Sequence, residues 1–183
     1  MVTVDGFPVA VSVSGPDKGP VVVMLGAAHH APGAYDAVCQ RLHTAQLRTV
    51  VIGPDRRLTA KGVVAILDSL GVQWALLVGD RVGGELAWEL AASRMDRFIG
   101  LVVIDRGHPR VADMTGVVRD EDCPPVEMNT TALVSTPAAR AVARASQRYV
   151  YGDFRLVEML GRRNVQESTA QLAAEIVLRT SGW

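Results

Sequence analysis

Runs of aliphatic and β-branched residues alternate with helical segments from about residue 20 to residue 180 of this chain. Most of these runs are continuous rather than alternately apolar and polar, which is typical of strands that are covered on both faces. Strands that alternate with helices predict a mostly parallel, doubly wound sheet with helices on both faces. The expected strands are residues 9–14, 20–25, 47–52, 74–78, 98–104, 131–135 and 154–159.

Helices are expected between these strands, and two of them begin with recognisable capping residues. Thr59 is the expected N-cap of a helix over 60–70. Thr136 precedes Pro137, which is favoured at the first helical position, and this helix is expected to run to about residue 150. Residues 105–129 are expected to form a loop with room for one short helix. The other expected helices are 35–45, 85–95 and 167–180.

Composition excludes several classes of function. The 183 residues predict one domain, over 1–183, and 49% hydrophobic residues against 21% charged ones exclude a disordered chain. Arg and Lys equal Asp and Glu at 19 each, so the basic excess of a nucleic-acid or membrane-surface binder is missing and neither partner is expected. No signal sequence or apolar spanning segment is recognisable, which favours a cytoplasmic protein with Cys39 and Cys123 as reduced thiols.

The most specific motif is WALLVGDRVGGELAWELA over residues 74–91, in which a buried strand, a glycine-bounded turn and a helix follow one another. It resembles the nucleophile elbow of the α/β-hydrolase fold, a G-x-S-x-G turn whose glycines let the middle side chain project from a sharp bend. Other segments resemble the same superfamily, among them GPVVVMLG, LRTVVIGPDRR, FIGLVVIDRGHPR, TTALVST and FRLVEMLGRRNVQES. The resemblance implies about eight strands and covers nearly the whole chain.

The residues expected to do the chemistry of that superfamily are missing. Arg81 occupies the nucleophile position, and a guanidinium cannot form an acyl-enzyme. Asp80 is one residue too early to replace the aspartate nucleophile of dehalogenase-like relatives. Residues 135–140, where the acid usually follows, contain no carboxylate, and Asn164 stands where the resemblance places the catalytic histidine. Asn164 is also a plausible helix N-cap. Only residues 106–130 are available for a lid, so no cap domain is expected.

Arg81 has two interpretations. At a tight turn before a helix, its positive charge beside backbone N–H groups suits a carboxylate or phosphate ligand. Alternatively, Arg81 forms a structural ion pair with Asp105 or Asp80. The residues expected to bind a ligand in the former active site are Gly26, Ala27, His29, His30, Asp80, Arg81 and Val82.

Two further residues are candidates for proton transfer. Asp105 follows a strand after which dehalogenase-like relatives place their acid, and His108 lies three residues on, so the two are candidates for a carboxylate–imidazole pair. No metal or cofactor is expected, because the adjacent His29 and His30 would point in different directions on an extended chain.

Three functions follow from these residues. The first is a non-hydrolytic protein that binds a small ligand, with an anion as one option, or a protein partner. The second is an enzyme of the hydrolase, lyase or isomerase type, in which Arg81 polarises a carbonyl while His29, His30 or the Asp105–His108 pair moves a proton. The third is a structural subunit that assembles with a partner or with its own copies.

Overall fold

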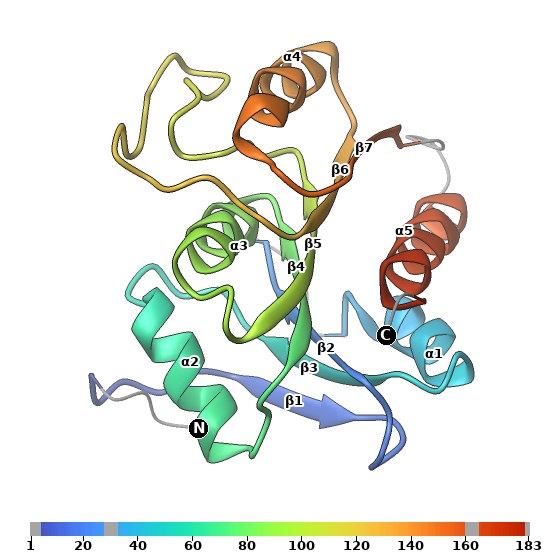
Figure 1. The fold of residues 1–183 in the computed structure, drawn as a ribbon. Coiled ribbons are helices and arrows are strands. Elements are labelled where there is room, and N and C mark those ends of the chain that lie inside the picture. Colours follow the sequence, from blue (N-terminus) through green and yellow to red (C-terminus); the bar gives the residue numbers. More distant parts are fainter. Residues whose placement is uncertain (1–4, 28–32, 160–164, 182–183) are drawn as a thin grey trace.

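The computed structural model describes residues 5–27, 33–159 and 165–181. These residues form a seven-stranded sheet in the order β1-β3-β2-β4-β5-β6-β7 (Figure 1). Every neighbouring pair is parallel except β1 and β3, which are antiparallel. The strands are β1 Val11–Ser14, β2 Val21–Leu25, β3 Arg48–Ile52, β4 Ala75–Asp80, β5 Phe98–Ile104, β6 Asn129–Val134 and β7 Phe154–Glu158. The described part of the chain thus has one strand fewer than the resemblance implied, because residues 5–10 add no strand ahead of β1.

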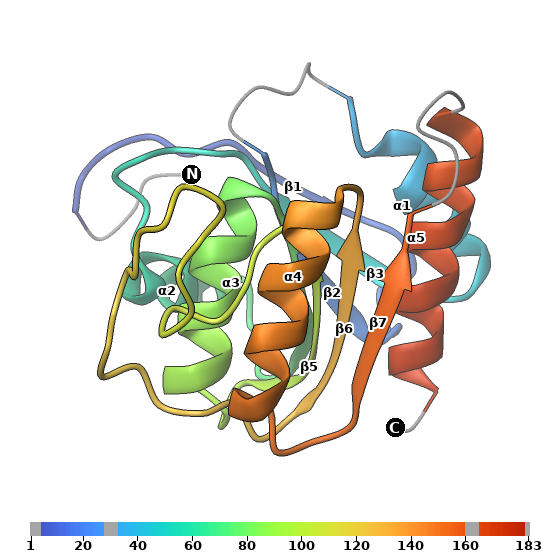
Figure 2. The same ribbon diagram turned by 90° about the horizontal axis from the view of Figure 1, so that it is seen from above.

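Helices cover both faces of the sheet, as predicted. Helices α1 and α5 pack together on one face, and α2, α3 and α4 lie on the other (Figure 2). Each face has its own apolar layer: Leu76, Val78 and Val102 pack towards α1 and α5, and Leu77, Leu101 and Val103 towards α3. The helices are α1 Asp36–Thr44, α2 Ala60–Ser69, α3 Val82–Ser93, α4 Pro137–Ser146 and α5 Val165–Thr180.

Both predicted caps are confirmed. The Thr59 hydroxyl accepts a hydrogen bond from the Gly62 N–H at 3.0 Å, and the Thr136 hydroxyl accepts one from the Ala139 N–H at 3.0 Å. Several predicted boundaries are wrong by two or more residues, and the two that bear on the site are those of α3 and α4. Helix α3 begins at Val82 rather than at residue 85, and α4 gives way to a 3₁₀ turn over Gln147–Tyr149.

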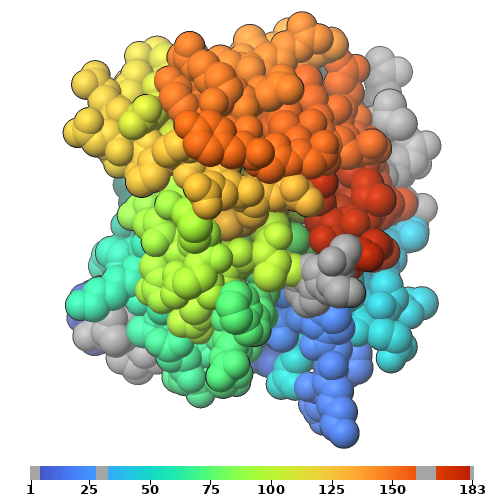
Figure 3. All heavy atoms as spheres, viewed as in Figure 1, coloured from blue at the N-terminus to red at the C-terminus, as the bar shows by residue number. Residues whose placement is uncertain are grey.

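The segment between β5 and β6, residues 105–128, contains no helix, so the short helix allowed for by the sequence is not formed and no cap domain is present there. It runs over the surface beside α4 (Figure 3). Within the segment, Arg119 Nη2 donates a hydrogen bond to the Gly107 carbonyl at 2.8 Å.

Two further expectations concern the whole chain. Cys39 and Cys123 are both buried and form no disulfide, which confirms the predicted free thiols. Among the described helices, none combines the length and the apolar character needed to span a bilayer.

Candidate functional site at the elbow

The turn between β4 and α3 has the strained geometry of an elbow. Strand β4 ends at Asp80, Arg81 adopts φ 51° and ψ −108°, and Val82 begins the helix. A positive φ is uncommon for a residue with a side chain, and it marks Arg81 as the apex. A Cβ atom on Gly83 would lie 2.2 Å from the Leu25 carbonyl oxygen, so only glycine lets the helix approach β2 this closely. The apex predicted from the sequence is confirmed.

The charge of Arg81 is matched by two carboxylates. Its Nη1 lies 2.8 Å from Asp80 Oδ1, and its Nε lies 3.9 Å from Asp105 Oδ2. The arginine side chain is half-exposed, whereas the carboxyl groups of Asp80 and Asp105 are 12% and 7% exposed. Both ion pairs of the second interpretation are therefore present in the structure.

Asp80 is also bound by Tyr35, a residue that precedes α1. The Tyr35 hydroxyl donates to Asp80 Oδ2 at 2.6 Å and accepts a hydrogen bond from the Ala27 N–H at 3.0 Å. Burial, together with the hydrogen bond and charge of Asp80, raises the pKa of Tyr35, so the phenol stays neutral. Tyr35 was not identified from the sequence, where no motif marks it.

Asp105 is bound to the end of strand β6. Its backbone has φ 54°, its Oδ1 accepts a hydrogen bond from the Ser135 N–H at 2.7 Å, and its Oδ2 accepts one from the Ser135 hydroxyl. Ser135 is therefore a second member of the site that the sequence did not indicate. Because β5 and β6 are parallel neighbours, their carboxyl ends bring these two residues together.

The predicted Asp105–His108 pair is not formed. His108 is fully buried; its Nε2 donates to the Pro124 carbonyl at 2.7 Å and its Nδ1 accepts from the Arg110 N–H at 3.2 Å. Its ring stacks on Tyr149 with the centroids 4.8 Å apart. Burial lowers the pKa of His108, so it is a neutral packing residue rather than a proton shuttle. The backbone turn at Asp105 directs the carboxyl group to β6 and away from this ring.

The remaining candidates from the sequence lie in two loops, one after β2 and one before α5. His29, His30 and Asn164 fall outside the described residues. Among the described residues that follow β2, Ala27 donates its N–H to the Tyr35 hydroxyl at 3.0 Å. Within the described ranges, no group of three His, Cys, Asp or Glu residues is placed to hold a metal ion.

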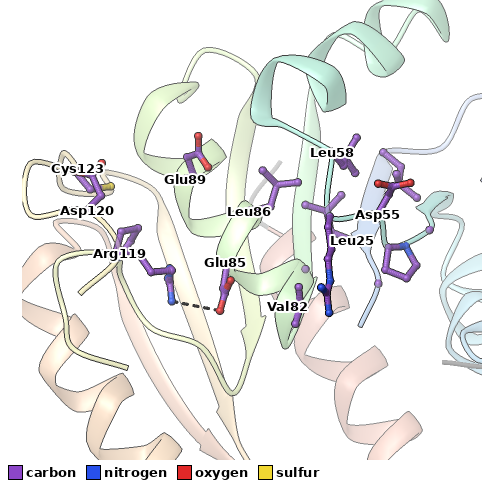
Figure 4. A pocket seen from close by; sticks show the side chains of 17 residues that line it. Leu25, Asp55, Leu58, Val82, Glu85, Leu86, Glu89, Arg119, Asp120 and Cys123 are labelled. Atoms are coloured by element: carbon purple, nitrogen blue, oxygen red, sulfur yellow. Dashed lines mark ion pairs between the residues drawn. The ribbon is translucent and has the colours of Figure 1, made fainter. Parts of the chain in front are cut away.

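A cavity of about 550 Å³ lies beside the elbow, over the first turns of α3 (Figure 4). The end of β2 and the segment after β3 form one wall, and the segment between β5 and β6 forms the other. An ion pair of 3.7 Å between Arg119 and Glu85 joins this second wall to α3. Gly26 and Val82 line the cavity, whereas the expected ligand-binding residues Ala27, Asp80 and Arg81 do not. Its apolar lining includes Leu25, Ile52, Leu58, Val82, Leu86 and Cys123.

Comparisons with known proteins agree with this geometry. No family model and no curated protein matches the chain. Solved structures do: an epoxide hydrolase of the α/β-hydrolase superfamily from metagenomes of hot environments is 12% identical with a TM-score of 0.78, and the alignment covers 100% of this chain and 97% of the other. The chain has the α/β-hydrolase fold.

Two other structures with this fold differ in the chemistry that their descriptions name. The epoxide hydrolase VrEH1 from Vigna radiata is 14% identical with a TM-score of 0.73, covering 100% of this chain and 97% of that one. AqDC, described by its recognition and ring-cleavage of the Pseudomonas quinolone signal, is 20% identical with a TM-score of 0.68, covering 99% and 98%. Because the fold supports several reactions, the site must decide the function of this chain.

Proposed function

We propose that this chain is a non-hydrolytic member of the α/β-hydrolase fold that binds a small, mainly apolar molecule in the cavity beside the elbow. One observation carries the proposal. The apex holds Arg81, whose charge is bound by Asp80 and Asp105, while a cavity lined by both apolar and charged side chains adjoins the same turn.

The contacts around the apex argue against covalent hydrolysis. Arg81 has no nucleophilic oxygen or sulfur. Asp80 lies before the apex, and its two carboxylate oxygens are bound to Arg81 and to the Tyr35 hydroxyl. The same hydroxyl accepts a hydrogen bond from the Ala27 N–H, which lies in the loop where the α/β-hydrolase fold places one oxyanion donor. The polar groups described around the apex therefore bind one another.

The size and lining of the cavity suit a ligand with one or two rings. Protein ligand sites commonly have volumes of about 300–1,000 Å³ with mainly apolar walls. Burying about 200 Å² of apolar ligand surface contributes about 5 kcal/mol at about 25 cal/mol per Å². A free energy of that size corresponds to a dissociation constant of about 0.2 mM, before the costs of association weaken it.

The alternative of rebuilt catalysis has less support. Of its proton carriers, His29 and His30 lie outside the described residues, and both ring nitrogens of His108 are bound away from Asp105, to Pro124 and Arg110. Arg81, which would polarise a carbonyl, is bound to two acids. Ligand binding without turnover needs none of these groups to be free.

Hydrolysis and binding assays together test the proposal. We expect no turnover of p-nitrophenyl acetate, butyrate or octanoate by the wild type, Arg81→Ala or Arg81→Ser, because none of them has a nucleophile with a base. We expect 1-naphthylmethanol to bind the wild type, measured by its fluorescence and by ligand-detected NMR.

A pair of leucine variants locates the binding site. Leu86→Trp fills the cavity from α3, whereas Leu178→Trp makes the same change at an exposed position of α5 on the opposite face of the sheet. Binding of 1-naphthylmethanol should weaken at least tenfold in Leu86→Trp and stay unchanged in Leu178→Trp. Ester turnover that depends on Arg81, or equal binding by both variants, would overturn the proposal.

A further inference from the structure

We propose that the cavity selects its ligand by charge and prefers a molecule with a basic nitrogen over a neutral or carboxylate analogue of the same shape. This inference rests on the proposed function, because it concerns the same cavity. It differs from the sequence interpretation, in which Arg81 would attract an anion.

The charged residues that line the cavity are mainly acidic. Four carboxylates face two guanidiniums in the lining: Asp55, Glu85, Glu89 and Asp120 against Arg56 and Arg119. Arg81 is not among the lining residues, so its charge does not offset this excess. A ligand in the cavity therefore meets more negative than positive side chains.

Ion pairs within the protein account for only two of these acids. Asp55 is bound by Arg57 at 2.8 Å, and Glu85 is bound by Arg106 at 3.2 Å and Arg119 at 3.7 Å. Arg119 is therefore bound to Glu85 and to the Gly107 carbonyl. Arg56 forms no ion pair among the described residues and partly offsets the two remaining acids.

The other two acids are Glu89 and Asp120, and Asp120 Oδ1 accepts a hydrogen bond from the Asp122 N–H at 2.9 Å. Neither forms an ion pair within the part of the chain that the structure describes. Glu89 comes from α3, and Asp120 comes from the segment that forms the facing wall.

These two carboxylates lie at the same end of the cavity. Glu89, Asp120 and Cys123 are grouped on the side opposite Leu58 and Asp55 (Figure 4). Burial, followed by the nearby charges of Asp120 and Glu89, raises the pKa of the Cys123 thiol to about 11, while the charges of Arg110 and Arg119 act in the opposite direction. An ammonium group at this end would be attracted by both acids while its apolar body lies along Leu86 and Leu58.

The size of the preference follows from the exposure of the acids. Glu89 and Asp120 are exposed, so water weakens each interaction to the range of surface ion pairs. Two such contacts correspond to about three- to tenfold tighter binding of an ammonium ligand than of its neutral analogue. The preference should shrink in about 0.5 M salt, because exposed charges are screened.

Three ligands that share one ring system test the charge preference. The three ligands are 1-naphthylmethylamine, 1-naphthylmethanol and the carboxylate of 1-naphthaleneacetic acid. They differ only in a cationic, neutral or anionic head group near pH 7. Titrations into the wild type, followed by fluorescence, should give the order amine, alcohol, carboxylate from tightest to weakest.

Glu89→Gln and Asp120→Asn should each lower the advantage of the amine about two- to threefold and leave alcohol binding unchanged. Glu121→Gln is the matched control, since it removes one exposed charge next to Asp120 but outside the cavity lining. It should change neither affinity.

The outcomes separate this inference from the proposed function. If none of the three ligands binds, the proposed function fails and the charge preference fails with it. If the alcohol binds as tightly as the amine, or the carboxylate binds best, the cavity is a ligand site but the charge preference is wrong. An amine advantage that Glu121→Gln lowers as much as Asp120→Asn would show general surface attraction and would also overturn the inference.

Discussion

Gly83 should be the least replaceable residue of the elbow for the stability of the fold. A Cβ atom at this position would lie 2.2 Å from the Leu25 carbonyl oxygen and 2.8 Å from that of Gly26. Both are backbone atoms, so they cannot rotate out of the way, and α3 would have to move from β2 by about 1 Å. Overpacking of this kind costs about 3 kcal/mol or somewhat more.

The expected effect of Gly83→Ala is a loss of about 6–12 °C in melting temperature, since about 1 kcal/mol corresponds to about 2–4 °C in a chain of this size. Gly62→Ala in α2 is the matched control. Its Cβ would meet Leu58 Cδ1 and Thr59 Oγ1 at 3.4 Å, which is ordinary contact. Alanine stabilises a helix relative to glycine by up to about 0.5–1 kcal/mol, and Gly62 lies in the first turn of α2, so this variant should melt no lower than the wild type and up to about 4 °C higher.

Thermal unfolding followed by circular dichroism measures both variants in the same buffer, and urea unfolding gives the free energies. Gly83→Ala should lower the melting temperature, whereas Gly62→Ala should not. If Gly83→Ala melts within about 2 °C of the wild type, α3 does not approach β2 as closely as described. The placement of Gly83 and Leu25 in the cavity lining would then also be wrong.

Two predictions concern buried groups. The pKa of His108 is lowered in the folded protein, so the unfolded chain binds a proton at this residue first and the free energy of unfolding should decrease as the pH falls below about 6.5. Urea unfolding at pH 7.5, 6.5 and 5.5 should show a smaller decrease for His108→Gln than for the wild type, and an equal decrease in both would contradict the prediction. The pKa of about 11 for Cys123 leaves on the order of 100-fold less thiolate near neutral pH than a free cysteine has. Iodoacetamide should therefore alkylate it far more slowly than the same residue in urea-unfolded protein, as followed by mass spectrometry, and equal rates would refute the burial.

The fold was predictable because its signals are local. The continuous apolar run that precedes Asp80 and the glycines that follow Arg81 predict a strand, a sharp turn and a helix without knowledge of the rest of the chain. The caps at Thr59 and Thr136 are equally local and are confirmed. The start of α3 was misplaced because glycine is unfavourable in a helix, whereas Gly83 is needed there for packing.

The partners within the site were less predictable, because they depend on how distant segments meet. Tyr35 and Ser135 carry no motif, and only the arrangement of neighbouring strand ends brings them to Asp80 and Asp105. Sequence spacing placed His108 beside Asp105, but a positive φ at Asp105 separates them. Sequence separation alone does not reveal such a turn at a residue other than glycine.

The contacts of Arg81 make its position epistatic with its neighbours. A serine in its place would leave the nearly buried carboxyl groups of Asp80 and Asp105 without their shared counter-ion, and like charges in a poorly solvated site repel. The Ala27 N–H would still be bound by Tyr35. A substitution at the apex should therefore be tolerated best when Asp80 or Asp105 changes with it, so these three positions are expected to vary together.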